Sequence, residues 1–425
     1  MRAWRWLVGA QLVALLACGG VTVARFHVWA EVDERAHYAY VQEVAENGRL
    51  PRIGDVVSWQ VQAITDNTWP RRSDRDPAQA GLAGRNYEAF QPPLYYLASV
   101  PAFAVAGDHR HKVFALRIFD LLLLAVAAAL LLVLAREVVP DAPLIAFAAG
   151  LGVLLWPGVV ARSVTVSNLP LELVLVTALM LALTRALRRR EPRWVLASGA
   201  LLGLCLLTKL TLVYLAVPFA IVLVRCFRAA PRAALGAAVL PALVLSPWLI
   251  SNLVRLGTLT ANNAARRQQT PYLYPTGNDF GLDDVPSRIW HLPDGVLSQE
   301  WARQLDVGWV QAAVLVLFLA LLAAALACVA TRGARALLLP GSAILAALVI
   351  AIATTVTAHW DVFLLRYYYA VLPPLAIGIA AHLHRANRDA LTASVLGIQT
   401  LLLGALWVDI AGAFYFTSLG NHLGI

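Results

Sequence analysis

Long apolar runs recur along most of this chain and decide what it can fold into. After a first run at about 4–24, further runs lie at roughly 113–135, 142–161, 169–187, 194–207, 210–227, 233–250, 308–330, 336–356, 368–382 and 390–411. About 20 apolar residues cross the hydrocarbon core of a bilayer as a helix. Lipid offers the backbone no hydrogen-bond partners, so each run must satisfy its own, as a helix does. The sequence therefore predicts an all-α polytopic membrane protein with about 11 transmembrane helices.

The amino-acid composition agrees with this fold class and argues against a nucleic-acid partner. The chain is 60% hydrophobic and 14% charged, whereas soluble proteins carry roughly 25% charged residues. The net charge of +9 comes mainly from arginines in short loops between apolar runs, where basic residues set membrane topology. We therefore expect no nucleic-acid partner. All cysteines lie inside apolar runs, which predicts packing residues and no disulfide framework: Cys18, Cys205, Cys226 and Cys328.

The basic residues also predict an orientation. If the N-terminus is inside, the arginine-rich loops, such as 185–193 and 225–232, all fall inside, as the positive-inside rule requires. Two long segments, 27–111 and 251–307, then fall outside. We expect one domain over 1–425 in a bacterial plasma membrane, with an extracytoplasmic first loop that carries short interfacial helices. The stretch 94–106 is apolar but too short to span, which is typical of such a helix.

The first outer loop opens with a cluster of titratable side chains. Asp33 and Glu34 are adjacent carboxylates, and on a helix both share a face with His37. Such a group could supply a general base or metal ligands. A solvated helix start is the plainer alternative, because acids are favoured near the positive end of the helix dipole.

Other polar side chains are predicted at the same face. Tyr87–Tyr96 contains Glu88, Gln91 and paired prolines that start the next helix. Glu172 begins one apolar run, Lys209 separates two, and Arg366 precedes another. A charge at membrane depth is costly unless it is paired or reaches the interface. Lys209 and Arg366 together could clamp a phosphate, although each alone is typical of an ordinary boundary residue.

With these motifs, the chain resembles the polyprenol-dependent glycosyltransferases of the C-type membrane fold. Among them are the bacterial relatives of protein O-mannosyltransferases and of the lipid A aminoarabinose transferase. The resemblance spans most of the chain and rests on these motifs in this order: Asp33-Glu34 with His37, Gly48–Pro51, Gln91–Tyr96, Arg117, Gly199–Lys209, Pro247-Trp248 with Asn252, and Arg366-Tyr367 with Pro373.

The resemblance implies inverting transfer of a sugar from a polyprenyl-phosphate donor to an acceptor hydroxyl on the extracytoplasmic face. The acceptor would be a glycan, a lipid or a protein. The implied roles are catalysis, with Asp33 as the general base and Glu34 as its support; donor-phosphate binding by Lys209, Arg366, Gln91 and Arg117; and metal or substrate contact by His37, Glu88 and Glu172. In the segment 251–307, Tyr272 and Tyr274 could stack on an acceptor sugar or anchor the segment at the interface. A divalent metal stays open, because Phe90-Gln91 and Asn168-Leu169 depart from the usual pattern of the family.

Three alternatives remain. A lipid-linked-sugar flippase or transporter is disfavoured, because the sequence shows no internal repeat and almost no charge in the middle of its apolar runs. A polysaccharide polymerase or ligase would use a related donor with a larger acceptor, bound by the segment 251–307. A membrane scaffold without catalytic activity is the plainest alternative.

Overall fold

Helices make up all the regular structure in the part of the chain that the structure describes. In this computed structural model the described residues are 2–26, 28–29, 31, 33–52, 55, 86–260, 281–297, 309, 312–313, 315–316, 335–358 and 364–411. No strand occurs among them. The predicted all-α polytopic membrane fold is confirmed.

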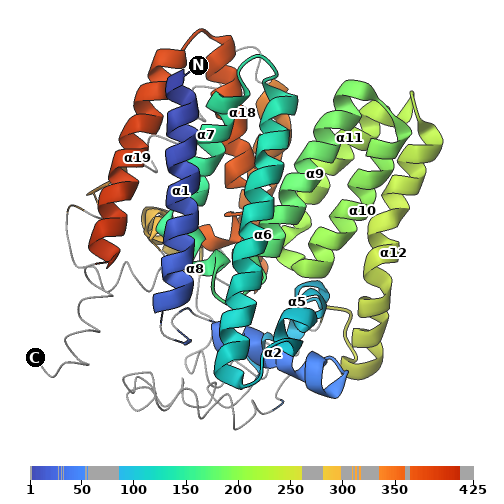
Figure 1. Cartoon of the computed structure of the whole chain (residues 1–425). Coiled ribbons are helices and arrows are strands. Elements are labelled where there is room, and N and C mark those ends of the chain that lie inside the picture. Colours follow the sequence, from blue (N-terminus) through green and yellow to red (C-terminus); the bar gives the residue numbers. More distant parts are fainter. Residues whose placement is uncertain are drawn as a thin grey trace, which may run out of the picture.

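Most of the predicted spans are long helices that stand side by side (Figure 1). Their bounds are α1 Arg2–Arg25, α6 His109–Val138, α9 Leu169–Arg189, η2 Leu210–Leu215 continued by α11 Ala216–Phe227, α12 Pro231–Leu256, α17 Leu338–Ala358 and α19 Asp389–Ala411. Within the described residues, these seven segments are long and apolar enough to cross a membrane. The sequence also marks their ends: α12 begins at Pro231 and stops before Gly257, whose φ of 68° suits glycine.

The predicted span at 142–161 is not one straight helix. It consists of α7 (Pro143–Leu154) and α8 (Pro157–Ser163), which meet at an angle of 73°. The break has a local cause, because Pro157 lacks an N–H and its ring would clash with the preceding helical turn. The bent pair could count as an eighth span. The predicted span at 308–330 lies almost entirely outside the described residues, so the total of eleven stays a prediction.

Two shorter helices complete the bundle, α10 (Pro192–Thr208) and α18 (Leu372–Arg385). They occupy the predicted runs at 194–207 and 368–382. α10 packs closely on α12, because Gly199 has no side chain where it meets the backbone of Ala237. α18 packs on α7, with Gly150 against Ile377.

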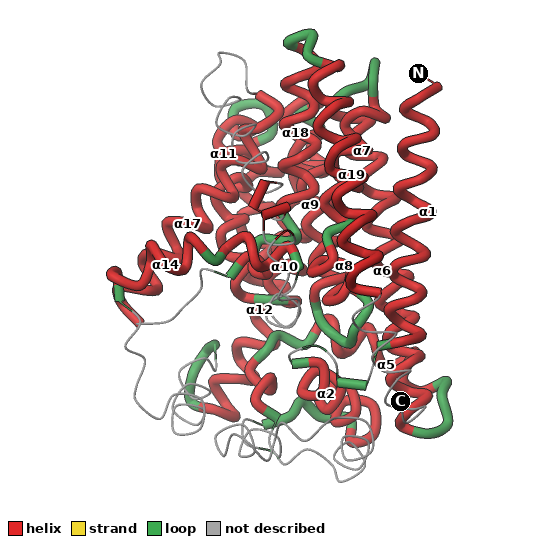
Figure 2. Tube along the Cα trace, turned by 90° about the vertical axis from the view of Figure 1, so that its left-hand side faces the viewer, coloured by secondary structure: helices red, strands yellow, loops and turns green. Residues whose placement is uncertain are grey.

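The first long segment forms a cap across one end of the helices (Figures 1 and 2). Its described elements are α2 (Glu34–Asn47), η1 (Tyr87–Phe90) and α5 (Leu94–Ala104), which match the predicted short interfacial helices. The N-terminus of α1 lies at the opposite end (Figure 1). The remaining short elements are η3 Leu282–Asp284, α14 Val285–Trp290, η4 Leu292–Val296, η5 Arg335–Leu337 and η6 Leu365–Tyr367.

A separate buried core with several aromatic side chains joins the helices of this cap to each other and, through Val113 and Leu116, to α6 of the bundle. The rings of Tyr40 on α2 and Tyr96 on α5 stack with centroids 3.6 Å apart. Tyr38 on α2 packs against Phe103 on α5, and all four side chains are buried. Aromatic pairs of this kind add about 0.5–1.5 kcal/mol beyond the burial of their area. The start of α2 is therefore held in a defined position on the bundle.

Candidate active site

Asp33 stands at the first turn of α2 in an unusual backbone conformation. Its φ of 75° lies in the left-handed region, which few residues adopt and which Asp and Asn tolerate better than most. The carbonyl of Asp33 accepts a hydrogen bond from the N–H of His37. The Asp33 carboxylate lies 3.9 Å from the Arg366 guanidinium, which η6 supplies from the far end of the sequence.

Glu34, the neighbouring acid, is locked in a bidentate ion pair. Arg117 on α6 donates from Nε and Nη2 to the two Glu34 carboxylate oxygens at 2.7 and 2.8 Å. Arg117 also donates to the Phe26 carbonyl, and Glu34 accepts from the Val166 N–H. Both charged side chains are fully buried. The pair therefore ties α1, α2, α6 and the segment after α8 together.

Two further acids at this end also have basic partners. Glu31 lies 3.6 Å from Arg162 on α8, and Glu172 at the start of α9 lies 2.9 Å from Lys209 at the end of α10. In each of these pairs the side chain of the acid is 1% exposed, whereas Arg162 is 15% exposed and Lys209 is 14% exposed. In the Asp33–Arg366 pair the exposed fractions are 18% and 24%. Of the four pairs, Asp33–Arg366 is thus the longest and the most exposed.

Glu88 of η1 lies in the same electrostatic environment. Its carboxylate accepts a hydrogen bond from the Gln91 side chain at 2.8 Å. Burial raises the pKa of Glu88 to about 7, and the negative charge of Asp33 acts in the same direction. Lys209 and Arg366 act against this rise. These side chains, which come from four separate segments, therefore lie close enough to influence one another.

His37 is held as a neutral imidazole beside these charges. Its Nδ1 shares a hydrogen bond of 2.8 Å with the Tyr96 hydroxyl. Burial lowers the pKa of His37 to about 3, although the charge of Asp33 opposes this change. His37 is therefore fixed in place and uncharged at neutral pH, which suits a hydrogen-bonding role better than proton uptake.

The structure brings most of the predicted site residues to one end of the bundle. Asp33, His37, Glu88, Lys209 and Arg366 form one group there. Glu34 and Arg117 lie beside it but are buried in contact with each other. Gln91 binds Glu88, and Glu172 binds Lys209. Tyr272 and Tyr274 lie outside the described residues.

The described side chains do not fit a metal site. No group of three or more His, Cys, Asp or Glu side chains in this part of the chain lies close enough to hold a metal ion. All three predicted candidates also have other partners, since Glu88 binds Gln91, His37 binds Tyr96 and Glu172 binds Lys209. Their positions give no basis for a catalytic step through a metal.

Sequence reasoning missed Arg162, whose charge also acts on His37. A signal was available, because Arg162 stands within the apolar stretch that runs from Leu151 to Val166, where a charge is costly without a partner. Its partner Glu31 lies two positions before the Asp33-Glu34 motif. Tyr96, for which the motifs predicted no role at the site, is buried against His37.

Comparisons with known proteins agree with the predicted resemblance. A family model described as dolichyl-phosphate-mannose-protein mannosyltransferase matches residues 91–250, less than half of the chain. That region contains Gln91, Arg117, Glu172 and Lys209 but none of the acids at the start of α2. A search of curated protein sequences finds no significant match.

Three solved structures are similar in their general helical arrangement. ArnT from Cupriavidus metallidurans bound to undecaprenyl phosphate is 14% identical, with a TM-score of 0.41, over 96% of this chain and 79% of that one. The apo form of the same protein is 17% identical, with a TM-score of 0.45, over 91% of this chain and 60% of that one. The Archaeoglobus fulgidus oligosaccharyltransferase in complex with Zn and sulfate is 15% identical, with a TM-score of 0.43, over 93% of this chain and 53% of that one. In the last two matches the chain covers less than two thirds of the other protein. The family match over residues 91–250 confirms both the resemblance predicted from the motifs and the predicted enzyme class, a membrane glycosyltransferase.

Proposed function

We propose that this chain transfers a sugar, with inversion, from a polyprenyl-phosphate donor to an acceptor hydroxyl at the extracytoplasmic face. The observation that carries the proposal is the Asp33–Arg366 pair, in which a carboxylate and a guanidinium face each other 3.9 Å apart and both remain partly exposed. The reaction needs a group that accepts a proton and a group that stabilises a departing phosphate. The match to a mannosyltransferase family supports the donor class.

Asp33 acts as the general base in this mechanism. It takes the proton from the acceptor hydroxyl while the hydroxyl oxygen forms a bond to the anomeric carbon. The bond between that carbon and the phosphate oxygen breaks on the opposite side, so the configuration inverts. The left-handed backbone at Asp33 costs of order 1–3 kcal/mol in typical cases, and the aromatic core beneath α2 holds the residue there.

Arg366 and Lys209 stabilise the leaving polyprenyl phosphate. A guanidinium can contact two phosphate oxygens at once, and an ammonium supplies three donors. Lys209 uses one of these donors on Glu172 at 2.9 Å, which leaves others for the donor lipid. Its Nζ also lies 5.7 Å from the centre of the Tyr367 ring, so two contacts orient the ammonium.

Glu34 and Arg117 have a positioning role in this proposal. Both side chains are fully buried and use their hydrogen-bonding groups on each other and on the backbone. They hold the first turn of α2, and hence Asp33, against α6. Glu34 thereby supports its neighbour, and the donor phosphate is bound by the more exposed Arg366 and Lys209.

The decisive experiment is a transfer assay with the purified protein, a panel of polyprenyl-phosphate sugars and the variant Asp33→Asn. Asn keeps the size and tolerates the left-handed backbone, but it cannot take a proton. Loss of a positioned base typically lowers the rate by about 10²–10⁴-fold. Glu46→Gln, at the far end of α2, is the matched control and should keep full activity. Wild-type turnover by folded Asp33→Asn would move the base to another acid, such as Glu88 or Glu172.

The extracytoplasmic placement has its own test. A cysteine introduced at position 46, at the capped end, should react with a membrane-impermeant maleimide on intact cells. A cysteine at position 188, at the other end of the bundle, should react only after the membrane is opened. The reverse labelling pattern would place the site at the cytoplasmic face.

A further inference from the structure

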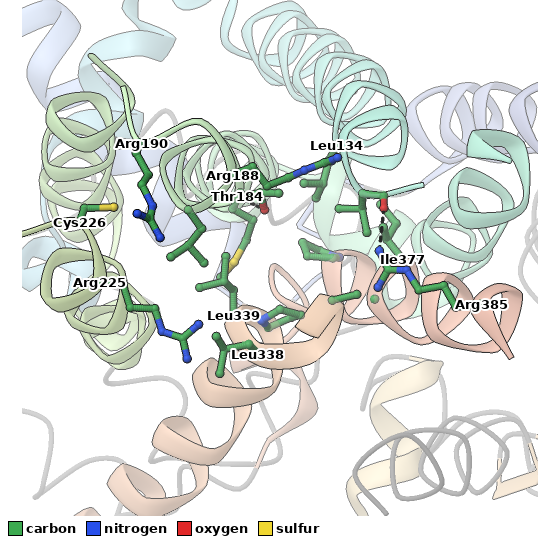
Figure 3. A pocket seen from close by; sticks show the side chains of 17 residues that line it. Leu134, Thr184, Arg188, Arg190, Arg225, Cys226, Leu338, Leu339, Ile377 and Arg385 are labelled. Carbon is green, nitrogen blue, oxygen red and sulfur yellow. Dashed lines mark hydrogen bonds between the residues drawn. The ribbon is translucent and has the colours of Figure 1, made fainter. Parts of the chain in front are cut away.

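A cavity of about 1100 Å³ lies among the ends of α6, α9, α11, α17 and α18. Among the residues that the structure describes, its wall contains none of the predicted site residues. Figure 3 shows Arg190 and Arg225 reaching from the ends of α9 and α11 into the same space, beside Leu338 and Leu339 of α17. Ligand pockets commonly measure roughly 300–1,000 Å³, so the cavity is large enough for a sizeable molecule.

The cavity is at the opposite end of the helices from the candidate active site. On α9, Glu172 belongs to the site and Arg188 to the cavity. Their positions differ by sixteen, which corresponds to about 24 Å at roughly 1.5 Å per residue. Because the hydrocarbon core of a bilayer is about 30 Å thick, the cavity opens at the level of the other membrane surface. The arginine-rich loops assign that surface to the inside.

The charged side chains that line the cavity are all positive in the described part of the chain. Its described lining includes Arg188, Arg190, Arg225 and Arg385, with no acidic side chain. Glu137 lies nearby and pairs with Arg188 at 3.6 Å. For Arg190 and Arg225, the described part of the chain shows no ion pair. Two guanidinium groups therefore share this space without a carboxylate from the described residues to balance them.

We propose that this cavity binds the phosphate headgroup of an anionic membrane phospholipid. Arg190 and Arg225 contact the phosphate oxygens, since a guanidinium fork matches phosphate geometry. Leu338, Leu339 and Ile377 line the cavity as well and pack against the acyl chains. Basic pockets between transmembrane helices on the cytoplasmic side commonly take such headgroups. A free inorganic anion would leave the apolar part of the wall without a partner.

The test compares lipid binding by the protein in a neutral detergent. Phosphatidylglycerol, phosphatidylcholine and inorganic phosphate are each titrated, and bound lipid is counted by native mass spectrometry. The double variant Arg190→Gln/Arg225→Gln should bind phosphatidylglycerol about 30-fold more weakly than the wild type. This factor assumes that each arginine contributes the binding free energy that is usual for a basic residue near an anionic membrane surface. The matched control is Arg228→Gln/Arg232→Gln, which removes two arginines from the same end but outside the cavity wall, and its affinity should stay within about twofold.

Each alternative outcome is distinct. Equal binding of phosphatidylcholine, or equal weakening in both double variants, would overturn the proposal, because the cavity would then not select a charged headgroup. Full competition by inorganic phosphate would assign the site to a soluble anion instead. A photoreactive phosphatidylglycerol, crosslinked to the wild-type protein, should label peptides of the helices that line the cavity, which are α6, α9, α11, α17 and α18. This last measurement needs no variant, and labelling confined to other helices would also overturn the proposal.

Discussion

Replacing Arg117 by Gln should show what the buried ion pair does for the fold. Arg117 contributes two hydrogen bonds to Glu34, at 2.7 and 2.8 Å, and one to the Phe26 carbonyl at 2.9 Å. Gln is shorter and neutral, so the variant leaves the buried Glu34 carboxylate with the Val166 N–H, at 3.2 Å, as a hydrogen-bond donor. Removing one partner of a buried pair typically costs about 3–5 kcal/mol. We expect a loss in that range for Arg117→Gln.

The double variant Glu34→Gln/Arg117→Gln provides the sharper measurement. It removes both charges, so no uncompensated carboxylate stays buried, and hydrogen bonding between neutral amides can replace part of the pair. The combined loss should therefore be smaller than the sum of the two single losses. Side chains in direct contact typically show coupling energies of about 0.5–3 kcal/mol, and we expect the upper part of that range here.

The assay is denaturant or thermal unfolding of the purified protein in one detergent, with transfer activity measured in parallel. Arg49→Gln is the matched control, because Arg49 pairs with Glu43 at 2.6 Å but is 50% exposed. Exposed pairs contribute about 0–1 kcal/mol. If Arg117→Gln were no more destabilising than Arg49→Gln, or if the losses at Glu34 and Arg117 simply added, the pair would not hold α2 against α6. The proposed positioning role of Glu34 would then be wrong.

Three further predictions concern other parts of the molecule. Lys209→Ala should raise the KM for the donor by about tenfold or more, since it removes a charge-assisted contact to phosphate; Glu172→Gln, which keeps the cation, should raise it less, and steady-state kinetics at saturating acceptor measure both. Burial raises the pKa of Glu88 to about 7, so this side chain is neutral below pH 7 and adds a negative charge above it. The donor KM should therefore increase as the pH rises through 7, and Glu88→Gln should flatten this part of the pH profile. Gly199→Ala should lower stability by about 1–3 kcal/mol, because a Cβ there would meet the α12 backbone, whereas Gly20→Ala, with open space around it, should be neutral or stabilising in the same unfolding assay.

The fold followed from the sequence wherever hydrophobic length decides the structure. The run at 113–135 is part of α6, and the run at 390–411 is α19, because a continuous apolar stretch in lipid has few alternatives to a helix. The same reasoning fails at 142–161, where Pro157 outweighs the apolar pattern and breaks the span. Hydropathy averages over a window, so a single backbone-breaking residue has little effect on it.

The candidate site was predictable in its acids and bases but not in their pairing. The resemblance implies a general base at Asp33 and a supporting role for Glu34, but the motif itself does not show what surrounds either acid. Their environments differ because Glu34 meets Arg117, 83 positions away, and the Val166 N–H, 132 positions away. Contacts at such separations depend on how α2, α6 and α8 pack, and no local pattern records them. Arg162 had a local signal of its own, but its pairing with Glu31 did not, since α2, α5, α6 and α7 lie between the two residues in the sequence.

Burial separates the charged pairs at this end into two kinds. A pair with no solvent exposure, such as Glu34–Arg117, cannot release its base to a substrate without leaving a buried charge, which is costly. Asp33 and Arg366 lie farther apart and keep contact with solvent. Breaking their ion pair so that Asp33 can bind an acceptor hydroxyl and Arg366 a phosphate therefore costs little free energy. Lys209 is paired with the buried Glu172, but its own ammonium is partly exposed. It can therefore bind the donor phosphate while it stays paired. The chemistry proposed here therefore falls to side chains that keep some contact with solvent, and the fully buried Glu34–Arg117 pair keeps Asp33 in place.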